Sequence, residues 1–204
     1  MHFEPGHIYH VYNRGNNKTP IFFGHHNYLF LLRKIKEEWL FYCEIFCYCL
    51  MPNHFHFMMM AKQNGCENII LKNQPSHLQE LSKVIGKTLS SYTKAINIQN
   101  DTTGNLFQKK TKAKCLTCDD MDNNHRNQDY LINCFHYIHD NPLASHLVND
   151  LKRWPYSSWP DYYGFRNETL CNKELTIERL GLSSIDFYSS KEPLIDKKII
   201  ELIW

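Results

Sequence analysis

Two histidines separated by a single residue, His54 and His56, are the first feature of the sequence that could do chemistry. Residues i and i+2 of a β-strand point to the same side, so both imidazoles would face one way, and Phe55 and Phe57 the other. Imidazole binds several divalent metals, and a pair on a rigid strand leaves coordination positions open for substrate oxygens. The tripeptide also arises by chance as two partly exposed histidines, so its neighbours must decide between these interpretations.

A second chemical feature lies downstream, where the periodicity predicts a helix over residues 130–141 that ends at Pro142. Tyr137 shares one stripe of this helix with Asn133 and with Asn141, which lies one turn further on. A tyrosine with a packing role would more often lie on the apolar stripe. That stripe contains Leu131, Cys134, Phe135 and Ile138.

The elements that must position these residues follow from hydrophobic periodicity. Strands are expected at 7–12, 42–51, 54–60 and 104–116, and helices at 27–41 and 78–96, with Ser76 as a cap and a loop at 119–128. The order βαββαβ is that of the α+β, ferredoxin-like arrangement, a four-stranded antiparallel sheet backed by two helices, whose open face is commonly functional. The tyrosine-bearing helix and a C-terminal extension would be added to it.

Length and composition limit the class of protein. The chain has 204 residues, of which 43% are hydrophobic and 22% charged, as in an ordinary globular protein with one main domain. No apolar stretch is long enough to span a bilayer, and the first residues lack the pattern of a secretion signal. We therefore expect a cytoplasmic protein with no membrane partner.

Eight cysteines raise the question of zinc, because Cys115 and Cys118 form a CxxC motif. The motif has no second pair downstream, and Cys43, Cys47 and Cys49 lie in an apolar strand where cysteine acts as a small hydrophobe. A structural zinc site is therefore disfavoured, and free thiols are expected in a reducing cytosol.

Positive charge is concentrated in the middle of the chain, although the net charge is only +2. Such a segment would attract phosphate groups. Lysines on an edge strand also prevent pairing with other chains, so the spacing alone leaves both interpretations open. The basic residues are Lys83, Lys87, Lys94, Lys109, Lys110, Lys112 and Lys114.

The segment around the two histidines, residues 48–56 (YCLMPNHFH), resembles the motif of the REP-associated tyrosine transposases, a branch of the single-tyrosine HUH transposases. Residues 9–15 (YHVYNRG) with 21–23 (IFF) resemble the family's first strand and loop. Three more segments match in family order: 104–108 (GNLFQ), 137–143 (YIHDNPL) and 154–159 (WPYSSW). The resemblance implies a catalytic domain over residues 1–165 and does not cover the tail, 166–204.

The resemblance implies a role for each candidate residue. Tyr137 would attack a DNA phosphorus, leaving a 5′-phosphotyrosine link and a free 3′-hydroxyl, and a phenol needs help to do so at neutral pH. His54, His56 and Asn141 would hold Mg²⁺ or Mn²⁺. The substrate would be single-stranded or hairpin DNA.

DNA-backbone contacts are implied for Lys109, Lys110 and Lys112, of which the last two match the family's basic positions. Thr111 departs from the usual aromatic residue, which puts base stacking there in doubt. Arg14, in the loop after the first strand, is a further candidate for a phosphate contact.

Three alternatives accompany this hypothesis. Tyr130 is the nearest rival nucleophile on the same helix. A non-catalytic module could bind nucleic acid on the same sheet, and a metal-dependent hydrolase would use water in place of tyrosine. The family includes both dimers and monomers, and a monomer is favoured here.

Overall fold

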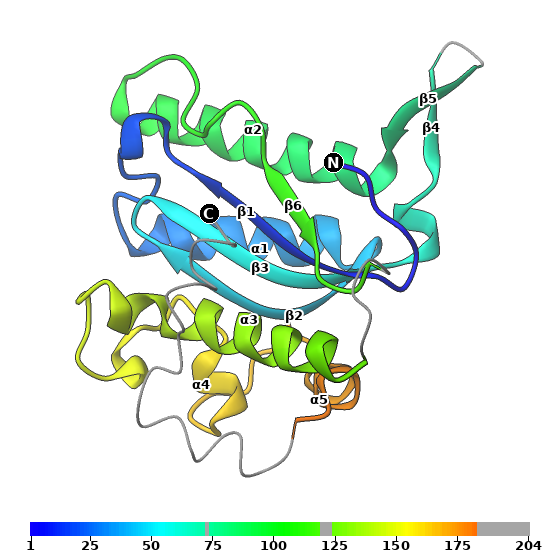
Figure 1. Ribbon diagram of the computed structural model, residues 1–204. Coiled ribbons are helices and arrows are strands. Elements are labelled where there is room, and N and C mark those ends of the chain that lie inside the picture. The colour runs from blue at the N-terminus through cyan, green and yellow to red at the C-terminus, as the bar shows by residue number, and fades with distance from the viewer. Residues whose placement is uncertain (72–73, 119–123, 183–204) are drawn as a thin grey trace.

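Four antiparallel strands form the main sheet, in the spatial order β2 (Cys43–Met51), β3 (His54–Ala61), β1 (Ile8–Arg14) and β6 (Lys112–Cys115). The structure is a computed structural model that describes residues 1–71, 74–118 and 124–182. Figure 1 shows the central pair, β1 and β3, running side by side. The expected antiparallel sheet is therefore confirmed, and β6 is its edge strand.

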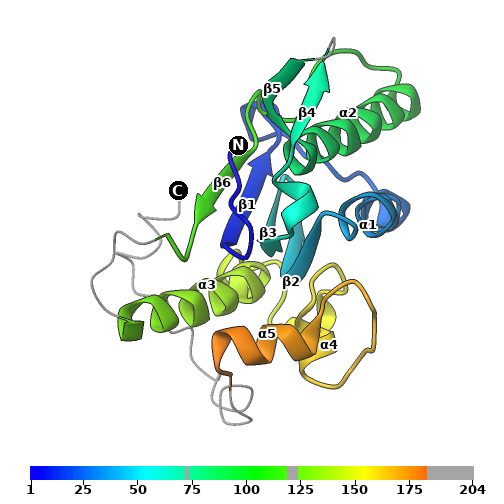
Figure 2. The same cartoon turned by 90° about the vertical axis from the view of Figure 1, so that its right-hand side faces the viewer.

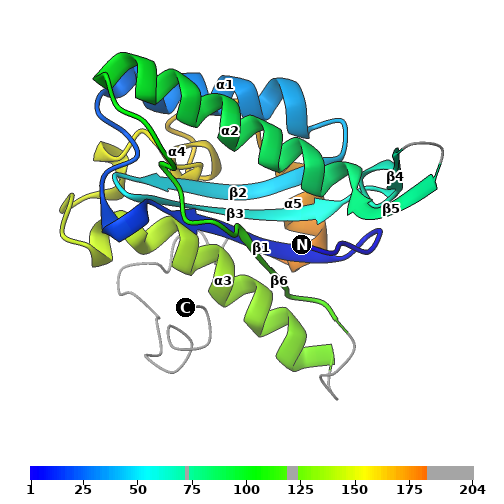
Figure 3. The same ribbon diagram turned by 90° about the horizontal axis from the view of Figure 1, so that it is seen from above.

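Helices cover both faces of this sheet. Figure 3 shows α1 (His25–Trp39) and α2 (Glu80–Asn100) on one face and α3 (Asn124–Ala144) on the other. The face that the sequence left open is thus covered by the tyrosine-bearing helix. None of the helices in the described part of the chain has the length and apolarity needed to cross a bilayer.

The continuous apolar character of β2 and β3 follows from this two-sided cover. Phe55 and Phe57 pack with the residues of α1 and α2, whereas Met58 packs with Phe135 and Ile138 of α3. All five side chains are fully buried. A strand covered on both faces is expected to be apolar throughout, so the two histidines of β3 are its exceptions.

A small second sheet was not predicted from the sequence. It pairs β4 (Asn68–Leu71) with β5 (Gln74–Gln79), and Figure 1 shows this hairpin projecting beyond α2. Ser76 and Leu78, expected in a helix cap and helix, lie in β5, so that prediction is wrong. The helix starts later because the side chain of Gln79 hydrogen-bonds the backbone N–H and carbonyl of Phe3 at 2.7 and 2.8 Å.

Three further boundaries, one of β6 and both of α3, also differ from expectation. Of the strand predicted at 104–116, only Lys112–Cys115 is regular, because the preceding residues make just an isolated bridge between Gly15 and Phe107. Helix α3 passes through Pro142, which falls in its last turn and removes one donor only. It also begins at Asn124, inside the predicted loop, of which 119–123 lie outside the described residues.

The cysteines are not all free as expected. Cys115 and Cys118 form a disulfide, because a separation of three residues brings their Cα atoms to 5.7 Å, within the range that a disulfide spans. The other six cysteines of the sequence are free.

Part of the C-terminal extension packs on the main sheet. Helix α5 (Lys173–Leu180) lies in this extension, and helix α4 (Trp159–Tyr162) shortly precedes it; both lie on the side of α3, as Figure 2 shows. Leu170 is buried in the core, and the guanidinium of Arg166 donates two hydrogen bonds to the Asp161 carboxylate at 2.7 and 2.9 Å. Residues 183–204 lie outside the described residues.

Replacing Phe57 with alanine should lower the free energy of unfolding by about 3–5 kcal/mol, because its buried ring packs against Trp39 and Tyr48. Phe41→Ala is the matched control, since Phe41 is 69% exposed, and should cost less than about 1 kcal/mol. Urea denaturation measures both values. Equal losses would contradict the placement of Phe57 in the core.

Candidate active site

The pleat of β3 turns His54 and His56 toward α3 while Phe55 enters the opposite core. The two imidazole rings lie 5.0 Å apart, centroid to centroid. His56 is 1% exposed, and His54 is half-buried at the end of the strand. The shared side predicted from the sequence spacing is therefore what the structure shows.

Each imidazole is oriented by a neighbour at its Nδ1 atom. His54 Nδ1 lies 2.6 Å from the amide oxygen of Asn53, and His56 Nδ1 lies 2.8 Å from Nε2 of His10. Contacts of this kind fix the ring orientation and leave Nε2 as the ligand atom. Both Nε2 atoms are buried inside the protein.

Helix α3 brings Tyr137 and Asn141 to the same place. The Tyr137 ring meets the His56 ring edge-on at a centroid distance of 5.5 Å. The Asn141 side chain lies beside His54. Its amide nitrogen donates to the Tyr137 carbonyl at 2.8 Å, so its amide oxygen stays available as a ligand atom. The four residues predicted as nucleophile and metal ligands are thus neighbours, although the histidine pair and the Tyr137–Asn141 pair lie more than 80 positions apart in the chain.

Burial keeps the histidines of this cluster uncharged. It lowers the pKa of His54 to about 4, with a smaller opposing effect of the Asn141 side chain, which favours the charged ring. It lowers the pKa of His10 to about 3, helped by the charge of Lys114, and that of His56 well below its ordinary value. Neutral imidazoles are the form that binds metal, so two nitrogen donors and an amide oxygen fit a divalent cation without prior loss of a proton.

Cationic side chains line the cavity beside the histidine pair. The cavity has a volume of about 140 Å³, and a neighbouring hollow of about 520 Å³ shares Arg14 and His54 with it. Lys110 and Lys112 line the cavity, and Lys112 Nζ lies 5.7 Å from the centre of the Tyr12 ring. This positive, half-open space is suited to a phosphate chain.

Lys109 lies elsewhere, outside the cavity that Lys110 and Lys112 line. Lys109 and Thr111 line a hollow shared with Gly86 and Ser90 of α2. Tyr130, the rival nucleophile, is seven residues or about 10 Å along α3 from Tyr137, with Lys114 Nζ 5.5 Å from its ring centre.

Two contributors to the site, His10 and Asn53, were not identified from the sequence. His10 is fully buried and stacks on His56 at 5.0 Å. The sequence did contain a sign of this role, because a histidine inside an apolar central strand needs a polar partner. Strand order was needed to show that this partner is His56.

No family model and no curated protein sequence matches this chain. Among solved structures, one similar to it is that of a REP-associated tyrosine transposase bound to a REP hairpin. The two chains are 14% identical, the match covers 97% of this chain and 93% of that one, and the TM-score is 0.57. This likeness confirms the expected α+β fold, with its four-stranded antiparallel sheet.

In the absence of metal, the buried histidines of the site should lower the free energy of unfolding as the pH falls from about 6.5 to about 4. The folded state keeps them neutral while the unfolded chain takes up protons, so the unfolded state gains at low pH. His54→Gln should reduce this dependence by about one proton, measured by urea unfolding with a chelator present.

The comparison must be between variants, because burial also raises the pKa of Asp140 to about 6, which contributes with the opposite sign. His77→Gln is the control, since its side chain is exposed on β5. The same pH dependence in His54→Gln and wild type would contradict the burial of a neutral imidazole at position 54.

Proposed function

We propose that this protein cleaves and rejoins single-stranded DNA through a covalent link between Tyr137 and a 5′-phosphate, with a divalent metal at His54, His56 and Asn141. The observation that carries the proposal is the contact of the Tyr137 ring with His56, while Asn141, one turn further along α3, lies beside His54. The Tyr137 ring is 5% exposed and packs in the core between α3 and the sheet. The proposal therefore rests on what lies beside this ring: two neutral histidines and a basic cavity.

The residues of the site divide the work. His54, His56 and Asn141 would hold Mg²⁺ or Mn²⁺, which when bound polarises a phosphate and stabilises negative charge on oxygen. Asn53 and His10 hold the two imidazoles in place through their Nδ1 atoms. Helix α3 supplies Tyr137 and Asn141 together, so the nucleophile and one ligand keep a fixed separation of one turn.

In the proposed reaction, one bond to phosphorus forms for each one that breaks. The phenolic oxygen of Tyr137 forms a bond to phosphorus as it loses its proton, and the bond from phosphorus to the 3′-oxygen of the DNA breaks; the proton lost by the phenol balances the one that the 3′-oxygen gains. That oxygen takes a proton and leaves as a 3′-hydroxyl. Attack by another 3′-hydroxyl on the phosphotyrosine reverses the sequence and joins two strands without an external energy source.

The DNA would lie along the cavity and the hollow beside it. Arg14, Lys110 and Lys112 would hold its phosphates, because their charges surround the side of the histidine pair that opens to solvent. The similar solved structure holds a REP hairpin, which supports a hairpin with flanking single strand as the substrate.

Tyr137→Phe should abolish covalent protein–DNA adduct, by at least ~10³-fold, while DNA binding stays within about twofold, because only the attacking oxygen is removed. The assay uses labelled hairpin-bearing DNA with Mn²⁺ and a denaturing gel. Tyr130→Phe is the matched control on the same helix and should keep wild-type adduct.

Chelation should remove the adduct, and added Mn²⁺ should restore it. Adduct formed by Tyr137→Phe but not by Tyr130→Phe would assign the nucleophile to Tyr130. DNA cut without adduct would indicate a water-using hydrolase, and binding without cleavage would indicate a non-catalytic module.

Lys110→Ala with Lys112→Ala should weaken DNA binding and reduce the slope of log K against log salt by about 2, one unit for each lost phosphate contact. Lys109→Ala is the control, because Lys109 lies on the α2 side. It should change the slope less than Lys110→Ala alone or Lys112→Ala alone. Fluorescence anisotropy over a salt series measures the slopes. An unchanged slope in the double variant would show that the two lysines contact no phosphate and only keep the strand edge solvated.

A further inference from the structure

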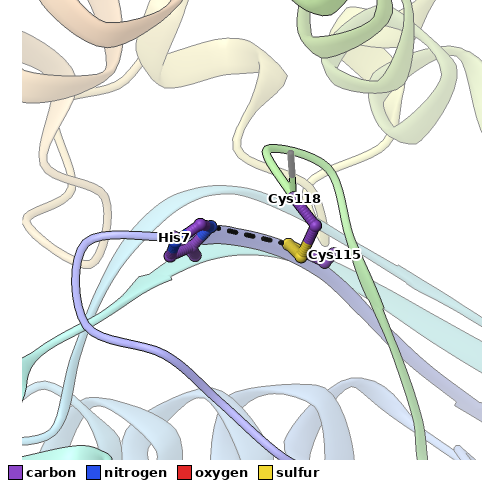
Figure 4. A group of neighbouring side chains, drawn as sticks. All are labelled: His7, Cys115 and Cys118. Carbon is purple, nitrogen blue, oxygen red and sulfur yellow. Dashed lines mark hydrogen bonds between the residues drawn. A yellow bond between two sulfur atoms is a disulfide. The ribbon is translucent and has the colours of Figure 1, made fainter. Parts of the chain in front are cut away.

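A second group of metal-binding side chains lies at the opposite end of β1 from the candidate active site. Figure 4 shows His7, Cys115 and Cys118 together, where the N-terminal segment meets the end of β6. Their ligand atoms lie within 4.8 Å of one another, and His7 Nδ1 is 3.8 Å from the sulfur of Cys115. His7 is five residues, or about 16 Å of strand, from Tyr12, which pairs with His56.

The imidazole of His7 is already turned toward the two sulfurs. A carboxylate oxygen of Glu4 lies 3.5 Å from its Nε2 atom, and the hydroxyl of Thr117 lies 3.2 Å from its Nδ1 atom. A carboxylate behind a histidine is the arrangement that orients histidine ligands in metal sites. The side chain of His7 is 25% exposed and Cys118 is exposed, so an ion from solvent can reach the group.

We propose that the reduced protein binds Zn²⁺ through His7 Nδ1 and the thiolates of Cys115 and Cys118, with water in the fourth position. Thiolates with an imidazole select zinc, whereas the imidazoles and amide oxygen at the candidate active site also suit harder cations. The protein would therefore have two metal sites that differ in ligand chemistry.

The disulfide and the zinc site use the same two sulfur atoms and exclude each other. A dithiol reductant transfers two electrons and two protons to the disulfide and becomes a disulfide itself. Zinc then replaces the two thiol protons, which are released to solvent. The disulfide joins two residues of one segment. Only the zinc form would tie the N-terminal segment, through His7, to the end of β6.

The test uses the full chain, reduced with a dithiol that is then removed, and titrated with Co²⁺ without oxygen. We expect a sulfur-to-cobalt charge-transfer absorption that reaches its limit at about one equivalent and disappears when Zn²⁺ is added. His7→Gln should weaken Co²⁺ binding at least about tenfold, because even loss of an outer partner of a ligand costs roughly 10–100-fold.

Three variants decide whether this absorption comes from the proposed group. Cys118→Ser should abolish it, and its exposed position makes the substitution easy for the fold to accept. Cys66→Ser, which changes a free and partly buried cysteine, should keep it. The paired substitution His54→Ala with His56→Ala should also keep it, which separates this site from the candidate active site.

Absence of the absorption in the reduced wild-type protein would overturn the proposal, as would an absorption that survives in Cys118→Ser. So would one lost in Cys66→Ser. None of these outcomes depends on DNA cleavage, so the zinc site and the proposed function are tested independently.

Discussion

The alternation of side chains along β3 is the constraint on which the rest of the site depends. One residue of each pair must fill the core under α1 and α2, so the other must face α3. Phe55 and Phe57 satisfy the first requirement and His56 the second, with no exposed face available to either. A shift of register by one residue would bury both histidines among aromatic rings and present phenylalanines to Tyr137, so the stability of the core and the geometry of the site are linked.

The same burial explains why the imidazoles of the site are neutral while the side chains along the cavity are charged. The histidines stay neutral because they are enclosed, and this makes them suitable as metal ligands in a protein with a positive cavity wall. Arg14, Lys110 and Lys112 keep contact with solvent and can meet phosphates there. The net charge of +2 therefore says little, whereas the placement of three cations beside uncharged imidazoles gives the cavity a positive wall that suits phosphate groups.

Much of the fold could be predicted, because strong periodicity defines the buried strands and α1 and α2. The shared side of His54 and His56 and the one-turn spacing of Tyr137 and Asn141 followed from the periods of strand and helix alone. The prediction that His54 and His56 meet Tyr137 and Asn141 came only from the resemblance to known transposases. The short β6 and the neighbours of His10 and His7 could not be predicted, since each depends on partners more than 40 residues away. The β4–β5 hairpin pairs locally, but Gln79 at its end is held by Phe3, 76 residues away. Local pattern carries no information about such pairings.

The most direct test of the central claim is a crystal structure of the protein with Mn²⁺, with the metal located by anomalous scattering. The account predicts a manganese ion within coordination distance of Nε2 of His54, Nε2 of His56 and the amide oxygen of Asn141, with Tyr137 beside it. Manganese bound elsewhere, or a fully loaded crystal in which these three atoms contact no metal, would contradict the assignment of this cluster as the catalytic metal centre.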